Sequence, residues 1–190
     1  MTPSLVRHRK RDLALQLLER QLRTTPVTLL TGLPESEVRK LYRMLHDRSP
    51  SSGPMQKAAT LIPNRRAHIR ASVFAAVYRR LASVSVTGTV DPQVLMQSYD
   101  VFRDFTKATF ENESIRPFDF TSAWVIARDL CDGEASMKAC PPCAVDYLVV
   151  DGSEVPHSCP FCALRAATPR RRVDDPNPSK RQLRQRGVKS

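Results

Sequence analysis

Four cysteines in two closely spaced pairs are the residues of this chain best suited to chemistry. Cys140 and Cys143 form one C-x2-C pair, fifteen residues follow, and Cys159 and Cys162 form the second pair. Each pair can form a tight turn that presents two sulfurs, and a hairpin can fold the second pair onto the first to complete a tetrahedron with metal–sulfur bonds of about 2.3 Å. Four protein ligands leave no open position, so we expect one structural zinc ion per chain.

Two other uses of these thiols stay open on the sequence alone. Soft thiolates disfavour magnesium, calcium and manganese, but they also suit iron in a rubredoxin-like site. The cysteines can instead be redox-active or unliganded. Two neighbouring residues are expected to lie outside the site. Cys131 follows an apolar helical stripe and is expected to be a buried core thiol, and His157 is expected to be exposed or to contact the ligands from outside.

A second candidate site lies near the N-terminus, where residues 25–43 have the layout of a helix-turn-helix. A short helix ends at Gly32, where a positive φ is needed, Leu33 anchors the turn, and a second helix begins at Pro34. In a major groove, the residues of the second helix able to reach bases and phosphates are Glu35, Ser36, Arg39, Lys40 and Arg43. The alternative is an ordinary helical hairpin with a solvated charged face.

The charge of the chain favours a polyanionic partner. Its 190 residues include 30 Lys and Arg against 19 Asp and Glu, which gives a net charge of +11 and a pI near 10.0. Residues 1–50 hold ten basic and five acidic side chains, residues 51–162 eleven and twelve, and residues 163–190 nine and two. The two ends are therefore the expected contact surfaces, and the tail adds Arg170, Arg171 and Arg172 as candidate DNA contacts. The alternative for the tail is a solvated, disordered end.

Other function classes are disfavoured. The four histidines are scattered, six glycines form no phosphate-binding loop, and no Ser or Cys nucleophile has a visible base, so we expect no enzyme activity and no small-molecule substrate. No window approaches the roughly 18 consecutive apolar residues of a membrane span. The start of the chain carries charge where a signal peptide needs apolar residues, which predicts a cytoplasmic protein without a membrane partner.

Apolar residues at helical spacing predict five helices before residue 135. Asp91 is the expected N-cap of the fourth helix, and Gly133 is the expected left-handed residue after the fifth. In chain order, the predicted stripes are Ala14, Leu17, Leu18 and Leu22; Val38, Leu41, Tyr42 and Leu45; Ile69, Val73, Val77 and Leu81; Val94, Leu95, Val101, Phe102 and Phe105; and Phe120, Ala123, Trp124, Ala127 and Cys131. So small a body is expected to leave apolar surface exposed for a partner, at Phe74, Tyr78, Tyr99 and Phe110.

The C-terminal region differs in character. A short β-type run, Tyr147 to Val150, precedes Asp151-Gly152, a pair suited to a type I′ hairpin turn, and residues 163–190 have the composition of a disordered segment. The expected fold is mainly α: a helical body with an N-terminal helix-turn-helix-like hairpin, a small C-terminal zinc-ribbon-like module with four cysteine ligands, and a disordered basic tail. The expected regions are 1–50 for DNA contact, 51–135 for the helical core and oligomerisation, 136–165 for zinc, and 166–190 for the tail.

The order of these segments resembles the FlhC family of bacterial flagellar transcription activators. The resemblance covers roughly residues 10–165 and is carried by Arg39-Lys-Leu-Tyr-Arg43, the Ser/Pro/Gly linker at 49–54, the helix from Ala71-Ser-Val-Phe74, Ser98-Tyr99, Ala123-Trp124 with Arg128, and the two cysteine pairs. It implies a cytoplasmic activator of flagellar genes that binds promoter duplex DNA, works as a hetero-oligomer with the FlhD subunit and contacts RNA polymerase. It also implies zinc on Cys140, Cys143, Cys159 and Cys162. Ala144 and Val145 depart from the family pattern, which has glycines there.

Two further interpretations stay open beside this resemblance. The helical body and the zinc module can form an adaptor that binds only protein, with the basic ends serving solubility. A weaker interpretation is a binder of single-stranded RNA, for which only Tyr147 and Phe161 offer stacking surfaces in the basic C-terminal half.

Overall fold

The computed structural model describes residues 2–82, 88–110 and 118–167, and of residues 108–110 only the backbone. The helices are α1 (Pro3–Glu19), α2 (Thr24–Thr31), α3 (Glu35–His46), α4 (Ala58–Leu61), α5 (Arg65–Leu81), α6 (Pro92–Phe110), α7 (Phe120–Asp132) and α8 (Pro160–Ala167), and the strands are β1 (Ala135–Ala139) and β2 (Asp146–Val150). This architecture confirms the predicted mainly α fold with a small C-terminal cysteine module. Within the described segments, no helix combines the length and the apolar character needed to cross a membrane.

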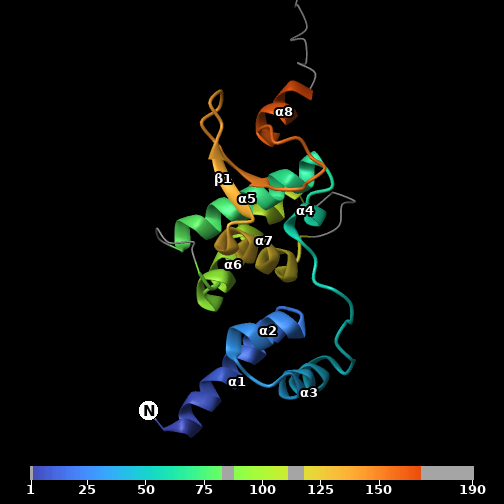
Figure 1. Ribbon diagram of the computed structural model, residues 1–190, viewed down its shortest axis with the longest axis vertical. Coiled ribbons are helices and arrows are strands. Elements are labelled where there is room, and N and C mark those ends of the chain that lie inside the picture. The colour runs from blue at the N-terminus through green and yellow to red at the C-terminus, as the bar shows by residue number, and fades with distance from the viewer. Residues whose placement is uncertain (1, 83–87, 111–117, 168–190) are drawn as a thin grey trace, which may run out of the picture.

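The first three helices form an N-terminal unit at one end of the molecule, and α8 and the strands lie at the other end (Figure 1). Leu17 and Leu18 of α1, Val27 of α2 and Val38 of α3 are fully buried and form the core of this unit. Ala14, Leu17, Leu18 and Leu22 are all buried, which confirms the first predicted stripe. The second stripe is confirmed at Val38, Leu41 and Tyr42 but wrong at Leu45, which is 37% exposed near the end of α3.

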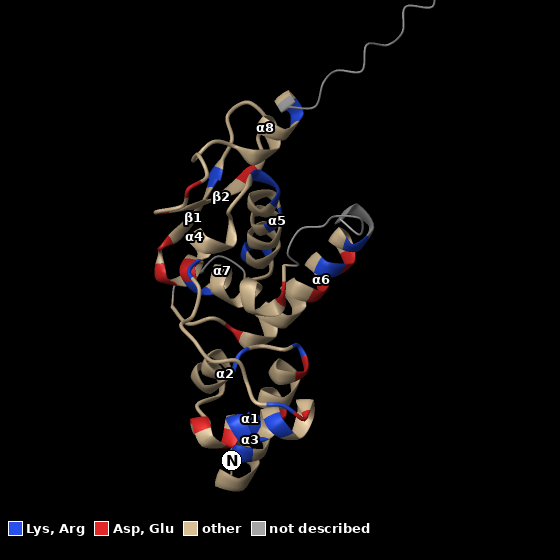
Figure 2. Ribbon diagram, turned by 90° about the vertical axis from the view of Figure 1, so that its right-hand side faces the viewer, with Lys and Arg blue, Asp and Glu red and all other residues tan. Residues whose placement is uncertain are grey.

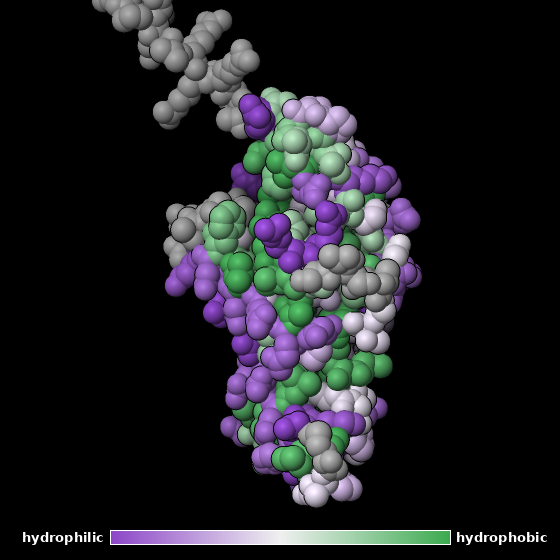
Figure 3. Space-filling view, turned by 90° about the vertical axis from the view of Figure 1, so that its left-hand side faces the viewer, coloured by the Kyte–Doolittle hydropathy of each residue, from purple (hydrophilic) through white to green (hydrophobic). Residues whose placement is uncertain are grey.

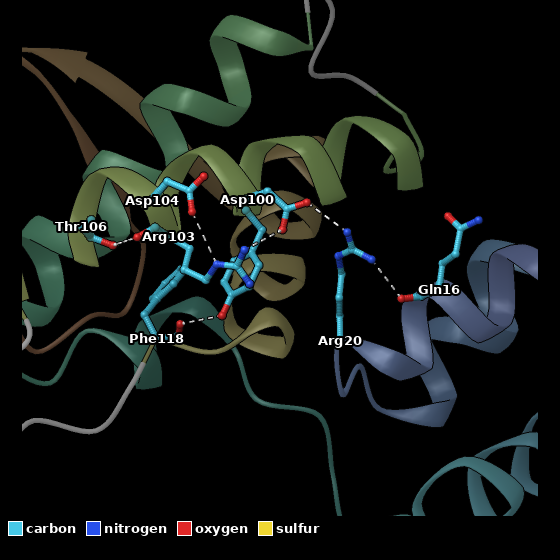
Figure 4. A network of polar contacts seen from close by, with 8 residues as sticks. Gln16, Arg20, Asp100, Arg103, Asp104, Thr106 and Phe118 are labelled. Atoms are coloured by element: carbon cyan, nitrogen blue, oxygen red, sulfur yellow. Dashed lines mark hydrogen bonds and ion pairs between the residues drawn. The ribbon is translucent and has the colours of Figure 1, made fainter. Parts of the chain in front are cut away.

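Polar contacts join the N-terminal unit to the middle of the molecule. At the end of α1, the guanidinium of Arg20 donates to Asp100 on α6 at 3.0 Å and to the carbonyl of Gln16 at 3.3 Å (Figure 4). Arg23 donates to the carbonyls of Gly53 and Pro54, at 2.8 and 3.0 Å. The linker between α3 and α4 is therefore tied back to the start of α2.

The helices of the body begin and end at the expected capping residues. Asp91 accepts hydrogen bonds from the N–H groups of Gln93 and Val94, at 2.7 and 3.1 Å, which confirms it as the N-cap of α6. Gly133 ends α7 with a φ of +79°, the left-handed conformation that glycine adopts freely. Asn64 caps α5, although the sequence had not singled it out.

The buried face of α5 differs from the predicted one. Ile69 is buried as expected, but Val73 and Val77 are only half-buried and Leu81 is 39% exposed. The inward residues of α5 are instead His68, Ile69, Arg70, Ala71, Ser72, Phe74, Ala75 and Tyr78. This helix packs against α6, α7, α8 and β2. These neighbours bury residues on more than one side of α5, so a single apolar stripe does not describe its buried surface.

Phe74 and Tyr78 do not provide exposed apolar surface, and that expectation is wrong. Phe74 is fully buried and Tyr78 is 2% exposed. The ring of Phe74 lies 5.8 Å from that of Phe102 on α6 and 5.4 Å from that of Phe118. Tyr99 is half-buried and stacks on the same group. An aromatic cluster closes over the middle of α5, which removes these rings from solvent.

Exposed apolar residues occur elsewhere, on α6 and also on the N-terminal unit, where Leu29 and Met44 are each 69% exposed. Val101 and Phe105 were predicted on its buried face but are 50% and 67% exposed, whereas Leu95 and Phe102 are buried as predicted. The side chain of Phe110 lies outside the described residues. Figure 3 shows one face of the molecule, on which apolar residues reach the surface between polar ones over the body and the C-terminal end. The exposed pair on α6 is therefore a candidate contact for another protein.

The two strands form an antiparallel hairpin in which Ala135 pairs with Val150 and Ala139 with Asp146. The predicted strand at 147–150 is present, but the predicted type I′ hairpin turn at 151–152 is wrong. The strand pairs with β1, which precedes it, and only Gly152 of the proposed turn has a positive φ, +73°. A type I′ turn needs a positive φ at both central residues.

Side chains of α5 attach the hairpin to the helical body. The backbone N–H of Leu148 donates to Ser72 Oγ at 3.1 Å, and His68 Nε2 donates to the carbonyl of Leu148 at 2.6 Å. Both backbone polar groups of Leu148 are satisfied in this way. Leu148 and Val150 also pack in the main hydrophobic core, whereas the four cysteines pack with Tyr147 and Val149 in a separate cluster, so the hairpin joins the cysteine module to the helical body.

Candidate metal centre and nucleic-acid interface

Two different elements bring the four cysteines together. Cys140 and Cys143 lie in the turn between β1 and β2, whereas Cys159 and Cys162 lie at the start of α8. The N–H of Ala163 donates to the carbonyl of Cys159 at 3.2 Å, so the second pair occupies the first turn of the helix.

The four sulfur atoms form a compact cluster. All Sγ atoms lie within 4.8 Å of one another, and the Sγ–Sγ distances of Cys140 to Cys162 and of Cys143 to Cys159 are both 3.7 Å. In a tetrahedron with metal–sulfur bonds of about 2.3 Å, neighbouring sulfurs are about 3.8 Å apart. A disulfide would bring two sulfurs to about 2.05 Å. The cluster therefore fits a metal ion held by four cysteines.

The turn that carries the first pair has a strained residue at its end. Ala144 has a φ of +55°, and its N–H donates to the carbonyl of Cys140 at 2.7 Å. The N–H of Cys140 in turn donates to the carbonyl of Val145 at 3.1 Å. The left-handed conformation costs an alanine about 1 kcal/mol but costs glycine little. A glycine in place of Ala144 would adopt the same conformation without this cost.

The cysteines of the metal-free cluster differ in acidity. A hydrogen bond from the backbone N–H of Val145 lowers the pKa of the Cys143 thiol to about 7. Hydrogen bonds with Cys143 and Cys140 raise the pKa of Cys162 to about 12, and burial raises the pKa of Cys140. Of Cys140, Cys143 and Cys162, Cys143 is therefore the one most readily available to a cation as a thiolate at neutral pH.

The remaining polar and aromatic groups near the cluster are not arranged as ligands. Cys131 is half-buried against the main core, with its Sγ 3.7 Å from the hydroxyl of Tyr78, and His157 is exposed as expected. Tyr147 is 9% exposed, and Phe161 is half-buried against the cysteines. The two proposed stacking surfaces for single-stranded RNA are thus largely withdrawn from solvent.

At the other end of the molecule, α2 and α3 form the predicted helix-turn-helix. Gly32 has a φ of +63° and Leu33 is 4% exposed, both as the sequence predicts. Val38 and Leu41 of α3 are buried against the N-terminal unit. All five candidate contact residues of α3 are exposed: Glu35, Ser36, Arg39, Lys40 and Arg43. The geometry of a helix-turn-helix is thus present, with its polar face open.

Ion pairs organise the charged face of α3. Arg39 pairs with Glu35 at 2.6 Å, one turn away on the same helix. Glu37 accepts a hydrogen bond from Arg7 at 2.9 Å and forms an ion pair with Arg11 at 3.2 Å, both on α1. Figure 2 shows the Lys and Arg residues of α1 and α3 near the N-terminal end of the molecule. The sequence alone did not indicate this pairing because the partners are far apart in the chain, although the spacing of Arg7 and Arg11 already puts both on one helix face.

The C-terminal tail lies mostly beyond the part of the chain that the structure describes. The candidate DNA contacts Arg170, Arg171 and Arg172 are outside the described residues. Residues 163–167, which were predicted to be disordered, form the second half of α8. The cysteines in the first turn of this helix anchor it to the hairpin, which composition alone does not reveal.

The fold and the two candidate sites define a mainly helical protein with a helix-turn-helix unit at one end and a potential four-cysteine metal site at the other. The chain matches the family described as flagellar transcriptional activator (FlhC) over residues 3–174, and it belongs to this family. It is 25% identical over 152 residues to the flagellar transcriptional regulator FlhC of Cupriavidus necator, an alignment that covers 79% of this chain and 72% of the relative. The protein is therefore a member of a family of transcriptional regulators, which is not a class of enzymes.

Proposed function

We propose that this chain binds promoter duplex DNA and activates flagellar genes in the cytoplasm, as the zinc-containing subunit of a hetero-oligomer with FlhD. The observation that carries the DNA-binding part is the structure of α3. Its apolar residues Val38 and Leu41 are buried, while Ser36, Arg39 and Lys40 point away from the N-terminal unit on the opposite face. A recognition helix needs this division between packing and exposed polar surface.

The exposed residues of α3 have different roles in this proposal. Arg39 reads a base edge, because an arginine fork matches the two acceptors of guanine in the major groove. Its ion pair with Glu35 at 2.6 Å occupies one part of the guanidinium and orients the rest. Lys40 and Arg43 bind phosphates, and the tail residues 170–172 add further phosphate contacts.

The metal in this proposal is zinc, and its role is structural. Four sulfur ligands saturate the ion, so no position remains for a substrate. Zinc has no redox chemistry of its own, and a transcriptional regulator of this family needs none from the cluster. The ion would hold the turn between β1 and β2 against the first turn of α8, because each element contributes two of the four ligands.

The third part of the proposal concerns the protein partners. Exposed apolar side chains at Val101 and Phe105 of α6 support a protein contact in the region 51–135, with residues 1–50 left for DNA, 136–165 for zinc and 166–190 for the basic tail. FlhD is the proposed subunit partner. An activator of transcription must also act on RNA polymerase, which is the second proposed protein partner.

The test is co-expression of the full chain with FlhD, followed by native mass spectrometry and duplex binding. The mass spectrum should show both subunits and one zinc ion per chain of this protein. Binding to a promoter duplex should be tighter than to a random-sequence duplex, and it should weaken steeply with salt. Arg39→Ala should reduce the preference, whereas Arg80→Ala on α5 is the matched control and should not. A complex without any salt-dependent duplex binding would refute the DNA-binding role.

A second candidate function is a zinc-stabilised adaptor that binds only proteins. The exposed Val101 and Phe105 favour it, since they offer an apolar contact that does not depend on nucleic acid. The same experiment separates the two functions. An adaptor would assemble with its protein partner and retain zinc, but it would bind promoter and random duplexes equally poorly at any salt concentration.

A further inference from the structure

Three basic residues of α1 have no role in the function proposed above. Arg7, Lys10 and Arg11 lie within two helical turns of one another in the N-terminal half of α1. Arg7 and Arg11 keep 68% and 50% of their side-chain surface exposed, although both contact Glu37 of α3. These residues bring the positive charge of α1 up to the side of the recognition helix.

The contact with Glu37 leaves both arginines able to bind an anion. Each guanidinium has five N–H donors, and the two contacts with the carboxylate each use one nitrogen, at 2.9 and 3.2 Å. The carboxylate itself is only 16% exposed, because the two arginines lie over it. A phosphate that approaches this side of α3 therefore meets two cations with most donors free, and it is shielded from the one carboxylate among them.

The positive surface continues from α1 onto α3. Residues three or four positions apart in a helix lie on the same side, so Glu37 is a neighbour of Lys40 on the helix surface. Arg43 follows Lys40 by three residues and is exposed as well, so the two side chains are neighbours on the same face of α3. These side chains therefore form a continuous band, which runs from Arg7 and Arg11 across Glu37 to Lys40 and Arg43.

Lys10 extends the same surface to the turn between α2 and α3. A Cβ added to Gly32 would lie 3.3 Å from the ammonium nitrogen of Lys10, so this side chain passes directly over the turn. The turn leads into the start of α3, where the exposed Ser36 lies. Lys10 thus places a third positive charge of α1 beside the end of α3 that enters a groove first in helix-turn-helix proteins.

From these contacts we infer that α1 is a second arm of the DNA interface, in which Arg7, Lys10 and Arg11 bind the phosphate backbone beside the groove that α3 enters. Glu37 is a positioning residue, because it holds the two arginines across the side of α3. This inference rests on the proposed duplex-binding function and adds residues to it. Backbone phosphates are the ligand that fits, since the band offers several exposed cations along a line.

The test uses the full chain in complex with its protein partner and measures affinity for two duplexes, a promoter fragment and a random-sequence duplex of about three helical turns. The variant Arg7→Gln/Arg11→Gln removes two cations of the band. Arg7→Lys/Arg11→Lys keeps the charges but loses the arginine fork. Arg80→Gln/Lys138→Gln removes two exposed cations from α5 and β1 and is the matched control. The glutamine side chains can still donate hydrogen bonds to Glu37, which is 16% exposed, so all variants should keep the melting temperature of the unmodified chain to within a few degrees.

Each phosphate contact adds about 0.9 to the slope of log affinity against log salt. The glutamine variant should therefore lose about two from this slope, and it should weaken on both duplexes by the same factor. The lysine variant should recover most of the slope, because a lysine is a sufficient point charge for a phosphate. The control should leave the slope unchanged.

Two results would overturn the inference in distinguishable ways. If the unmodified complex binds duplex and the glutamine variant retains its slope, α1 faces away from the DNA, while the proposed role of α3 stands. If the glutamine variant and the control lose the same slope, general charge and not this surface is responsible. A complex that binds neither duplex refutes the proposed function itself, and the α1 inference with it.

Discussion

Loss of the metal should destabilise the whole protein and not only the cysteine module. Cys143→Ser removes one of four ligands, and binding of zinc to a four-cysteine site is linked to folding by roughly 10 kcal/mol or more, so the hairpin and α8 should unfold in this variant. The hairpin belongs to the main core through Leu148 and Val150, which are 0% and 3% exposed. The helical body should therefore lose the stabilisation that this contact provides.

The size of that loss can be worked from the contacts. Burial of a Leu or Val side chain contributes about 1.5–3 kcal/mol, and each hydrogen bond from His68 and Ser72 to Leu148 contributes about 1 kcal/mol. The sum is about 5–8 kcal/mol, which for a chain of this length lowers the melting temperature by roughly 10–30 °C. A change in melting temperature of this size can be measured with a probe in the helical body, away from the cysteines.

Trp124 provides the assay, since it is the one tryptophan of the chain and lies 4% exposed on α7, in the helical body. Its fluorescence during thermal unfolding should shift to lower temperature in Cys143→Ser, and in the unmodified chain after treatment with a zinc chelator. Cys131→Ala is the matched control, because Cys131 lies outside the cluster and should keep both metal and midpoint. An unchanged Trp124 transition after the metal has been removed would refute the reasoning that hairpin and body share one core.

Three further predictions follow from single residues. Ala144→Gly should change the free energy of unfolding by no more than about 0.5 kcal/mol, because relief of the left-handed strain offsets the greater conformational freedom of glycine in the unfolded chain. Ala144→Val introduces a β-branched residue and should lower the free energy of unfolding by more than about 1 kcal/mol. Equal denaturation midpoints for the two variants would contradict this prediction. Arg39→Ala should cost about 1–3 kcal/mol in binding to promoter duplex and much less for random duplex, as measured by fluorescence anisotropy, and equal losses would assign Arg39 to a phosphate. Burial lowers the pKa of His68 below 6.5, so the unfolded chain takes up the proton first and the stability of the fold should fall as the pH drops below about 6.5. With zinc kept saturating, His68→Gln should flatten this pH dependence in thermal melts. Parallel curves for the two proteins would contradict the assignment of the pH dependence to His68.

The features that the sequence predicted are those whose causes lie within a few residues. Three such residues act at the ends of their own helices: Gly32, which is left-handed and lies between two amphipathic segments, and the capping residues Asp91 and Gly133. They can therefore be recognised without knowledge of the rest of the fold. The two cysteine pairs are almost as local, because metal coordination restricts the spacing within each pair. Their convergence to within 4.8 Å was therefore predictable from spacing alone.

Only the tertiary structure decided which surfaces meet. The buried face of α5 depends on four neighbouring elements, and the exposure of Phe105 on α6 depends on which side of that helix the body covers. Apolar residues occur on more than one side of both helices, so periodicity cannot choose between the sides. The ion pairs of Glu37 with Arg7 and Arg11 likewise join α3 to α1. Such contacts arise from the packing of whole elements, and no local pattern in a single sequence encodes the partner.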